Sequence, residues 1–183
     1  MKELLLSIKK EKRICAIYRL SCDPEQFSVG YILKVGEDSI LMQSISPYGE
    51  YDGYIYRLID DIASVEIDTE YLKEIKFLSD YNNLTVNDLD FSDDEILSDL
   101  ISYIKREQLI CTISLFNDNE RCLCGLINGV TGNLLKVEVV DEHGYKSGYA
   151  FADINEISAV NIQSEDENKL QILYKQKQDL LNK

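Results

Sequence analysis

Hydrophobic positions follow two rhythms along this chain, and the succession of rhythms occurs twice. A spacing of three and four residues places Leu4, Leu5 and Ile8 on one helical face, and a second such face follows Ser92, which precedes Glu95 at capping-box spacing. After each helical segment come five short stretches rich in Val, Ile and Tyr that alternate apolar and polar residues, as strands do. The pattern predicts a short helix followed by five antiparallel strands, twice.

The two copies align residue by residue. A shift of 96 positions superimposes the helical segments and first strands, and a shift of 95 positions superimposes the remainder, with one residue lost between them. A single indel over so long a span is hard to obtain by chance, so two homologous modules are predicted, residues 1–78 and 92–175. Pairs that match at the second shift include Gly30 with Gly125, Gly49 with Gly144, Gly53 with Gly148 and Tyr54 with Tyr149.

The segment between the modules, residues 79–91, is rich in Asn and Asp and holds no Lys or Arg. Such a composition buries little, so we predict an acidic, solvated linker that also supplies anions to the next helix. A docking surface for a basic partner is the alternative. After the fifth strand both copies become helical again, with Ser164 and Glu167 at capping-box spacing, and residues 176–183 are predicted to form a helical tail.

A strongly bent five-stranded sheet of this size is expected to close on itself, because closure removes exposed strand edges. Gly30 and Gly125 lie in the middle of equivalent strands, where a tight barrel corner is expected. The predicted fold is therefore mainly β with flanking helices. It comprises two tandem five-stranded small barrels, each preceded by a short α-helix.

This arrangement resembles the Sm-like (LSm-type) small barrels, in which a strand glycine is followed by apolar residues at fixed spacing. SH3-like barrels, including the WYL ligand-sensing domains, share much of the pattern, but no matching cluster of arginines is present. The residues that carry the resemblance are Gly30, Ile32, Val35, Leu41, Ile62, Val65 and Ile67 in the first module and Gly125, Ile127, Val130, Leu135, Ile157, Val160 and Ile162 in the second.

The positions at which the Sm-like family contacts RNA carry other residue types here. A base cannot hydrogen-bond to an isoleucine side chain, and an aspartate repels a phosphate. The resemblance therefore implies a barrel whose RNA-contact residues are not retained. The residues at those positions are Gly36, Ile40, Leu58 and Ile59 in the first module and Thr131, Leu135, Asp153 and Ile154 in the second.

Charge supports the same expectation. The chain has 183 residues, with 19 Lys and Arg against 33 Asp and Glu, so its formal net charge is −14. A surface with this negative charge repels nucleic acid and anionic membranes electrostatically at long range. The longest apolar stretches are only a few residues, and five cysteines are an odd number, so we expect a cytoplasmic protein with reduced thiols.

Candidate catalytic groups are few. His143 is the only histidine and lies in a predicted turn, where a solvated surface role is expected. Cys111, Cys122 and Cys124 together with His143 form one conceivable zinc set, but a Cys-x-Cys pair within a strand wraps a metal poorly, so core packing is predicted for the cysteines. We assign no catalytic, cofactor-binding or metal-binding residues and expect no enzyme.

Tyrosine is frequent, with 12 residues, and tryptophan is absent. Tyrosines gather around the third turn and fourth strand of both copies, either as rings of a barrel wall or as a binding surface. The candidate partner-binding residues are Tyr48, Tyr51, Tyr54, Tyr56, Tyr145 and Tyr149.

The predicted function is non-enzymatic: duplicated small barrels bind or scaffold a protein partner, with a homodimer joined through edge strands as a further expectation. The alternative is an acidic inhibitor or immunity-type protein that blocks a basic surface. RNA binding of the Sm-like kind is less favoured.

Overall fold

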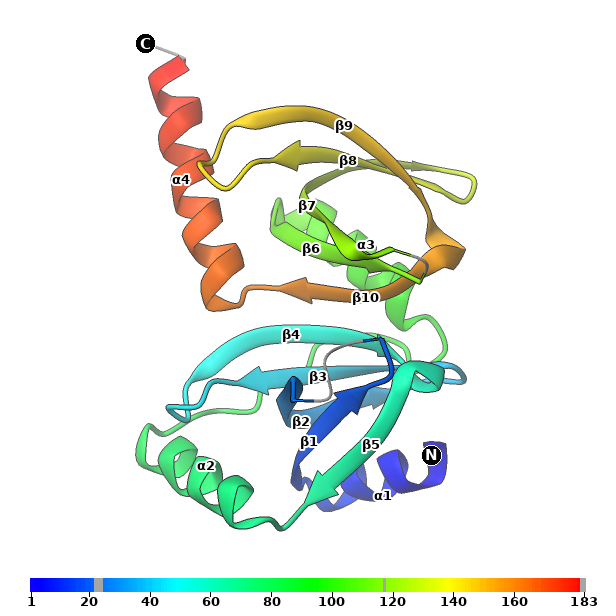
Figure 1. The fold of residues 1–183 in the computed structure, drawn as a ribbon, viewed down its shortest axis with the longest axis vertical. Coiled ribbons are helices and arrows are strands. Elements are labelled where there is room, and N and C mark those ends of the chain that lie inside the picture. Colours follow the sequence, from blue (N-terminus) through cyan, green and yellow to red (C-terminus); the bar gives the residue numbers. More distant parts are fainter. Residues whose placement is uncertain (22–24, 117, 182–183) are drawn as a thin grey trace. The chain divides into compact units, whose positions relative to one another are not determined.

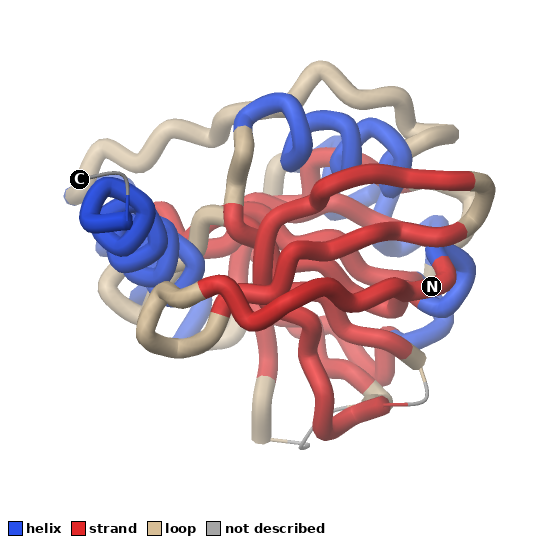
Figure 2. Tube along the Cα trace, turned by 90° about the horizontal axis from the view of Figure 1, so that it is seen from above, coloured by secondary structure: helices blue, strands red, loops and turns tan. Residues whose placement is uncertain are grey.

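The computed structural model describes residues 1–21, 25–116 and 118–181. The chain divides into two compact units, Met1–Asp99 (unit 1) and Leu100–Lys183 (unit 2). Strands account for 42% of the chain and helices for 33%, and the helices border the strands rather than interrupting the sheets (Figures 1 and 2). The prediction of a mainly β fold with flanking helices is confirmed.

Unit 1 runs from a helix through five strands to a second helix, in the order that the hydrophobic rhythm predicts. A single 3-10 turn separates its last two strands. Its elements are α1 (Lys2–Glu11), β1 (Ile14–Arg19), β2 (Phe27–Val35), β3 (Ser39–Ile45), β4 (Tyr51–Leu58), η1 (Ile59–Asp61), β5 (Ile62–Ile67) and α2 (Glu70–Tyr81).

Unit 2 repeats this order, and the helix that opens it begins within the last residues of unit 1. The predicted helical tail is the end of one long helix, α4. The elements are α3 (Ile96–Glu107), β6 (Ile110–Leu115), β7 (Asp118–Thr131), β8 (Leu134–Val140), β9 (Lys146–Asp153), η2 (Ile154–Glu156), β10 (Ile157–Ile162) and α4 (Glu165–Leu181).

Both units contain an antiparallel sheet of the same strand order. Unit 1 has the order β5-β1-β2-β3-β4, and unit 2 has the order β10-β6-β7-β8-β9. The register matches as well, since Gly30 pairs with Ser44 in unit 1 and Gly125 pairs with Val139 in unit 2. Residues 95 positions apart therefore occupy the same place in the two sheets.

The prediction that each module closes into a barrel is not confirmed, because the sheet is open. In unit 2 the strands β10 and β9 stand at opposite ends of the order, and the ladders recorded for the described residues do not join them. Closure requires a hydrogen-bonded ladder between the first and last strands. Strand β9 is consequently bonded on one side, to β8.

A glycine in the second strand of each unit permits the sheet to fold closely over itself. A Cβ atom on Gly30 would lie 2.0 Å from the carbonyl oxygen of Gln43, and one on Gly125 would lie 2.0 Å from that of Glu138. Real Cβ atoms do not approach an oxygen so closely, so only glycine fits at these two positions.

Hydrophobic side chains on the two faces of the unit 1 sheet form separate clusters. The first packs α1 against one face through Leu5 and Ile8. The second packs α2 against the opposite face through Leu72 and Ile75, and the half-buried side chain of Leu84 joins it. Leu84 comes from the segment that was expected to be a solvated linker, so this segment belongs to the packing of unit 1.

The two predicted capping boxes have different outcomes. At the start of α4 the main-chain N–H of Ser164 donates to the Glu167 carboxylate, which also accepts from the Ser164 hydroxyl. Before α3, by contrast, the N–H of Ser92 donates to Asp99, 2.8 Å away, and not to Glu95. Helix α3 therefore begins at Ile96, later than the spacing of Ser92 and Glu95 predicts.

Candidate functional site

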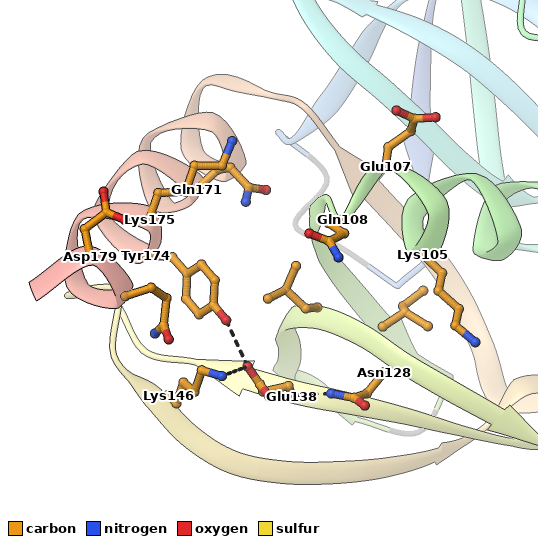
Figure 3. Close-up of a pocket in the computed structure, with 13 residues that line it drawn as sticks. Lys105, Glu107, Gln108, Asn128, Glu138, Lys146, Gln171, Tyr174, Lys175 and Asp179 are labelled. Atoms are coloured by element: carbon orange, nitrogen blue, oxygen red, sulfur yellow. Dashed lines mark hydrogen bonds and ion pairs between the residues drawn. The ribbon is translucent and has the colours of Figure 1, made fainter. Parts of the chain in front are cut away.

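A cavity of about 610 Å³ lies in unit 2, between the C-terminal half of α4 and the sheet (Figure 3). This volume is in the usual range for ligand-binding pockets in proteins. Its walls come from the end of α3, from β7, β8 and β9, and from α4. The residues used below are Lys105, Leu126, Asn128, Glu138, Lys146 and Tyr174.

Glu138 lies at the centre of the wall formed by β8, with only 7% of its surface exposed. Glu138 is paired with Tyr149 of β9, so the two side chains lie on the same face of the sheet. Four donors approach its carboxylate: Lys146 Nζ at 2.9 Å, the Tyr174 hydroxyl at 3.0 Å, the Tyr149 hydroxyl at 3.4 Å and Asn128 Nδ2 at 3.5 Å.

These donors determine the charge state of Glu138. Burial acts to raise the pKa of its carboxyl group, but the hydrogen bonds from Lys146 and Tyr174 outweigh burial and hold the pKa below its ordinary value. The hydrogen bond to Glu138 correspondingly raises the pKa of Lys146. The pocket therefore carries a buried carboxylate and a neighbouring ammonium at neutral pH (Figure 3).

The equivalent place in unit 1 is covered by the chain itself. Gln43 stands 95 positions before Glu138 and has the same register. Its side-chain Nε2 donates to the carbonyl of Thr85 at 3.0 Å, and its Oε1 accepts from the N–H of Asn87 at 2.7 Å. The hydroxyl of Tyr54 donates to the carbonyl of Asn87 at 3.2 Å. Residues 84–87 thus lie in the groove that corresponds to the open pocket of unit 2.

The acidic residues after Asn87 are also engaged. Asp88 lies 3.4 Å from Lys34 Nζ. Asp93 accepts from Lys9 Nζ at 2.9 Å and from the main-chain N–H of Val35 at 3.2 Å, and these bonds lower the pKa of Asp93 against the opposing effect of burial. Asp88 and Asp93 therefore attach this part of the chain to unit 1 through lysines, while most residues between 79 and 91 are exposed, as expected of a solvated connector.

The six candidate partner-binding tyrosines fall into two groups. Tyr54 and Tyr56 are buried, and burial raises the pKa of Tyr56 to about 12. Tyr48 and Tyr51 of unit 1 expose 76% and 38% of their surface and are not among the residues that line the pocket. The two from unit 2, Tyr145 and Tyr149, expose 49% and 55%.

The unit 2 tyrosines are held by lysines. Lys136 Nζ lies 4.0 Å from the centroid of the Tyr149 ring, and Lys177 Nζ lies 4.9 Å from that of Tyr145. Such cation–π contacts fix the rings while leaving one ring face to solvent. Tyr145 and Tyr149 therefore border the pocket as oriented, accessible aromatic groups.

The cysteine and histidine set does not assemble. Cys111 is fully buried, and burial raises its pKa, whereas Cys122 is exposed. The side chain of His143 is 72% exposed and lies nearest to Glu142, at 3.5 Å. Across residues 1–21, 25–116 and 118–181 no group of three or more His, Cys, Asp and Glu side chains has a metal-binding arrangement. Cys22 lies outside the described residues.

The pocket was not predicted from the sequence, although one signal pointed to it. Gln43 and Glu138 are polar residues at the same position of two mostly apolar strands, ILMQSI and LKVEVV. A buried polar side chain requires a partner, and here the partners come from distant residues.

Comparison of the chain with family models, with curated proteins and with solved structures finds no match. None of the helices in the described part of the chain combines the length and the apolar character needed to cross a membrane. The function must therefore be argued from the geometry of the two units.

Proposed function

We propose that this chain is a non-enzymatic binding or scaffold protein, built from two Sm-like small barrels, whose unit 2 contacts a protein partner. The observation that carries the proposal is the outer face of β8 and β9. Tyr149 and Phe151 lie two residues apart on β9, hence on one face, and expose 55% and 65% of their surface. Exposed aromatic residues on a fixed strand are typical of binding surfaces.

The edge of β9 supports the same proposal. This strand is the last in the strand order of unit 2, and among the residues that the structure describes it pairs with β8 alone. An edge strand offers unpaired main-chain groups to another chain, from a different protein or from a second copy. Leu134 on β8, half exposed, extends the apolar face.

The residues at the family's RNA-contact positions support a protein partner over RNA. Ile40 is fully buried, and a Cβ atom on Gly36 would lie 2.6 Å from the carbonyl oxygen of Asp93. The loop that would face RNA in unit 1 is therefore covered by the segment before α3. The acidic-inhibitor alternative loses support as well, because Asp88 and Asp93 in that segment pair with lysines of unit 1.

The test compares capture of host proteins by the immobilised wild-type chain and by Phe151→Glu. Phe77→Glu is the matched control, since Phe77 is also an exposed aromatic residue, at 70%, but lies on α2 of unit 1. We expect a specific partner to be retained by the wild type and the control and lost from Phe151→Glu. Equal retention by all three, or none by any together with a monomer in light scattering, would overturn the proposal.

A further inference from the structure

We propose that the pocket of unit 2 binds an extended acidic peptide segment of the partner, with a leucine-sized side chain inserted between α4 and β7. The inference rests on the proposed function and names the ligand class. It predicts that unit 2 holds its ligand as unit 1 holds residues 84–93 of its own chain.

The bound segment of unit 1 shows the mode of recognition. Leu84 inserts its side chain into the cluster that contains Tyr31 and Ile45. The carboxamide of Gln43 then pairs with the main chain at Thr85 and Asn87. Farther along, Lys9 at the end of α1 holds Asp93. Three features therefore define the site. They are an apolar anchor, a side chain that hydrogen-bonds the main chain beside it, and a lysine that pairs with an acid nine positions after the anchor.

Unit 2 has the same framework. Lys105 lies 96 positions after Lys9 and is therefore its equivalent. The helices that carry these lysines end in the same way, because the residues three positions later, Lys12 and Gln108, both have a φ of 53°. Leu126 stands where unit 1 has Tyr31, opposite Glu138 as Tyr31 is opposite Gln43. Leu126 therefore gives the pocket an apolar residue at the position of Tyr31, against which an anchor residue can pack.

The described residues of unit 2 leave this groove uncovered. In unit 1, α2 ends at Tyr81, and Asn83 adopts a positive φ of 55° that turns the chain back over the sheet. In unit 2, α4 continues to Leu181. Figure 1 shows this long helix beside the ends of β8 and β9. The groove that is filled in one copy is therefore an open pocket in the other.

The clamp in unit 2 is made of two residues in place of one. A glutamine both donates and accepts, whereas an ionised glutamate only accepts. Lys146, 2.9 Å from Glu138, supplies the missing donor. Lys146 can thus donate to a peptide carbonyl. Glu138 Oε2, whose contacts with Tyr149 and Asn128 are long at 3.4 and 3.5 Å, can accept from a peptide N–H in their place, so the pair serves as the Gln43 carboxamide does.

Charge favours an acidic ligand at the far end of the pocket. Lys105 lines it from α3 and Lys175 lines it from α4, both without an ion pair among the described side chains (Figure 3). Of the nearby carboxylates, Glu107 is paired with Arg106, and Asp179 lies next to Lys175 on α4. Unit 2 as a whole holds 9 Lys and Arg against 12 Asp and Glu, so most of the net charge of −14 resides in unit 1. Repulsion of an acidic peptide by unit 2 is correspondingly small.

The experiment uses a fluorescein-labelled peptide with the sequence of residues 82–95, titrated with the full chain and followed by fluorescence anisotropy. We expect saturable binding that is weakened at least about tenfold by Leu126→Ser, which removes the apolar side chain against which the anchor packs, and roughly fivefold by Lys105→Glu. The matched control is Lys169→Glu, the same charge change on α4 away from the pocket-lining residues. A peptide with Leu84 and Asp93 both replaced by alanine should not bind.

Several results would overturn the inference: no binding up to millimolar chain, or binding that Leu126→Ser and Lys105→Glu both leave unchanged. Lys105→Glu is a surface change, so it remains informative if Leu126→Ser fails to fold. If the host partner is lost with Phe151→Glu but retained with Leu126→Ser and Lys105→Glu, the proposed function stands and the peptide pocket does not.

Discussion

The side-chain oxygen of Gln43 accepts a hydrogen bond of 2.7 Å from the main-chain N–H of Asn87, 44 residues away. The same carboxamide donates to the carbonyl of Thr85, so one buried side chain holds the main chain at both ends of the stretch from Thr85 to Asn87. Hydrogen bonds of this kind, made by a fully buried group, favour a single position of the segment. The compact part of unit 1 consequently extends to Asp99, beyond the end of α2.

Replacement of Gln43 tests this attachment. We expect Gln43→Ala to lower the free energy of unfolding by about 2 kcal/mol, because two part-buried hydrogen bonds to the main chain are lost from a fully buried side chain. Amide hydrogen exchange at residues 85–93 should accelerate more than exchange elsewhere in unit 1. Gln26→Ala, at an exposed position, is the control and should change neither measurement. Unaltered exchange at residues 85–93 in Gln43→Ala would show that the segment is held by other contacts.

The strand glycines provide a second prediction. Gly30→Ala and Gly125→Ala should each lower the free energy of unfolding by about 3 kcal/mol or more, because the added methyl group meets a main-chain carbonyl oxygen that cannot move without breaking a ladder. Gly129→Ala lies in the same strand as Gly125, with no atom within 4 Å of the new Cβ, and should be close to neutral. Denaturant unfolding of the three variants measures the contrast. Similar stability of Gly125→Ala and Gly129→Ala would contradict the packing described.

The elements and their duplication were predictable because both depend on local spacing. The hydrophobic periodicities of helices and strands identify segments that bury one face. Because the sequence is repeated, each element is indicated twice, once in each copy. The start of α3 was placed too early because Asp99, seven residues after Ser92, takes the N–H that the capping-box rule assigns to Glu95. Side-chain competition of this kind is not visible in the spacing alone.

The pocket depended on contacts that no local pattern reports. Leu84 is one of several apolar residues in this stretch, with Val86 and Leu89, and its packing against unit 1 goes with the hydrogen bonds from Gln43 to the main chain that follows it. The tyrosines illustrate the same point, since the spacing places Tyr54 and Tyr149 at equivalent positions, but in the described residues Tyr54 donates to the main chain of Asn87 and Tyr149 donates to the Glu138 side chain.

The buried carboxylate of unit 2 predicts a dependence of stability on pH. The pKa of Glu138 is lowered in the folded chain, so its contribution is present above the ordinary pKa of glutamate, near 4.3, and is lost as the pH falls through the folded value. We expect Glu138→Gln to reduce the free energy of unfolding by roughly 1 kcal/mol at pH 7. The difference from the wild type should shrink between pH 5 and pH 3.

Urea unfolding at a series of pH values measures that difference. The control is Glu142→Gln, in which the replaced side chain is 86% exposed on the loop before β9. This variant should follow the wild type at every pH. A constant gap between the wild type and Glu138→Gln across the series would mean that the stabilisation by Glu138 does not depend on its charge.

The cysteines provide the last prediction, because their environments differ while their chemistry is the same. Cys15 and Cys111 are fully buried, and burial raises the pKa of Cys15 to about 12, so very little of its thiol is ionised at pH 8. Cys122 is exposed. In a Cys22→Ser background, iodoacetamide should alkylate Cys122 at least about a hundredfold faster than either buried thiol, as peptide mass spectrometry can follow. Addition of denaturant should abolish the difference, and equal rates in the folded chain would contradict the core packing assigned to Cys15 and Cys111.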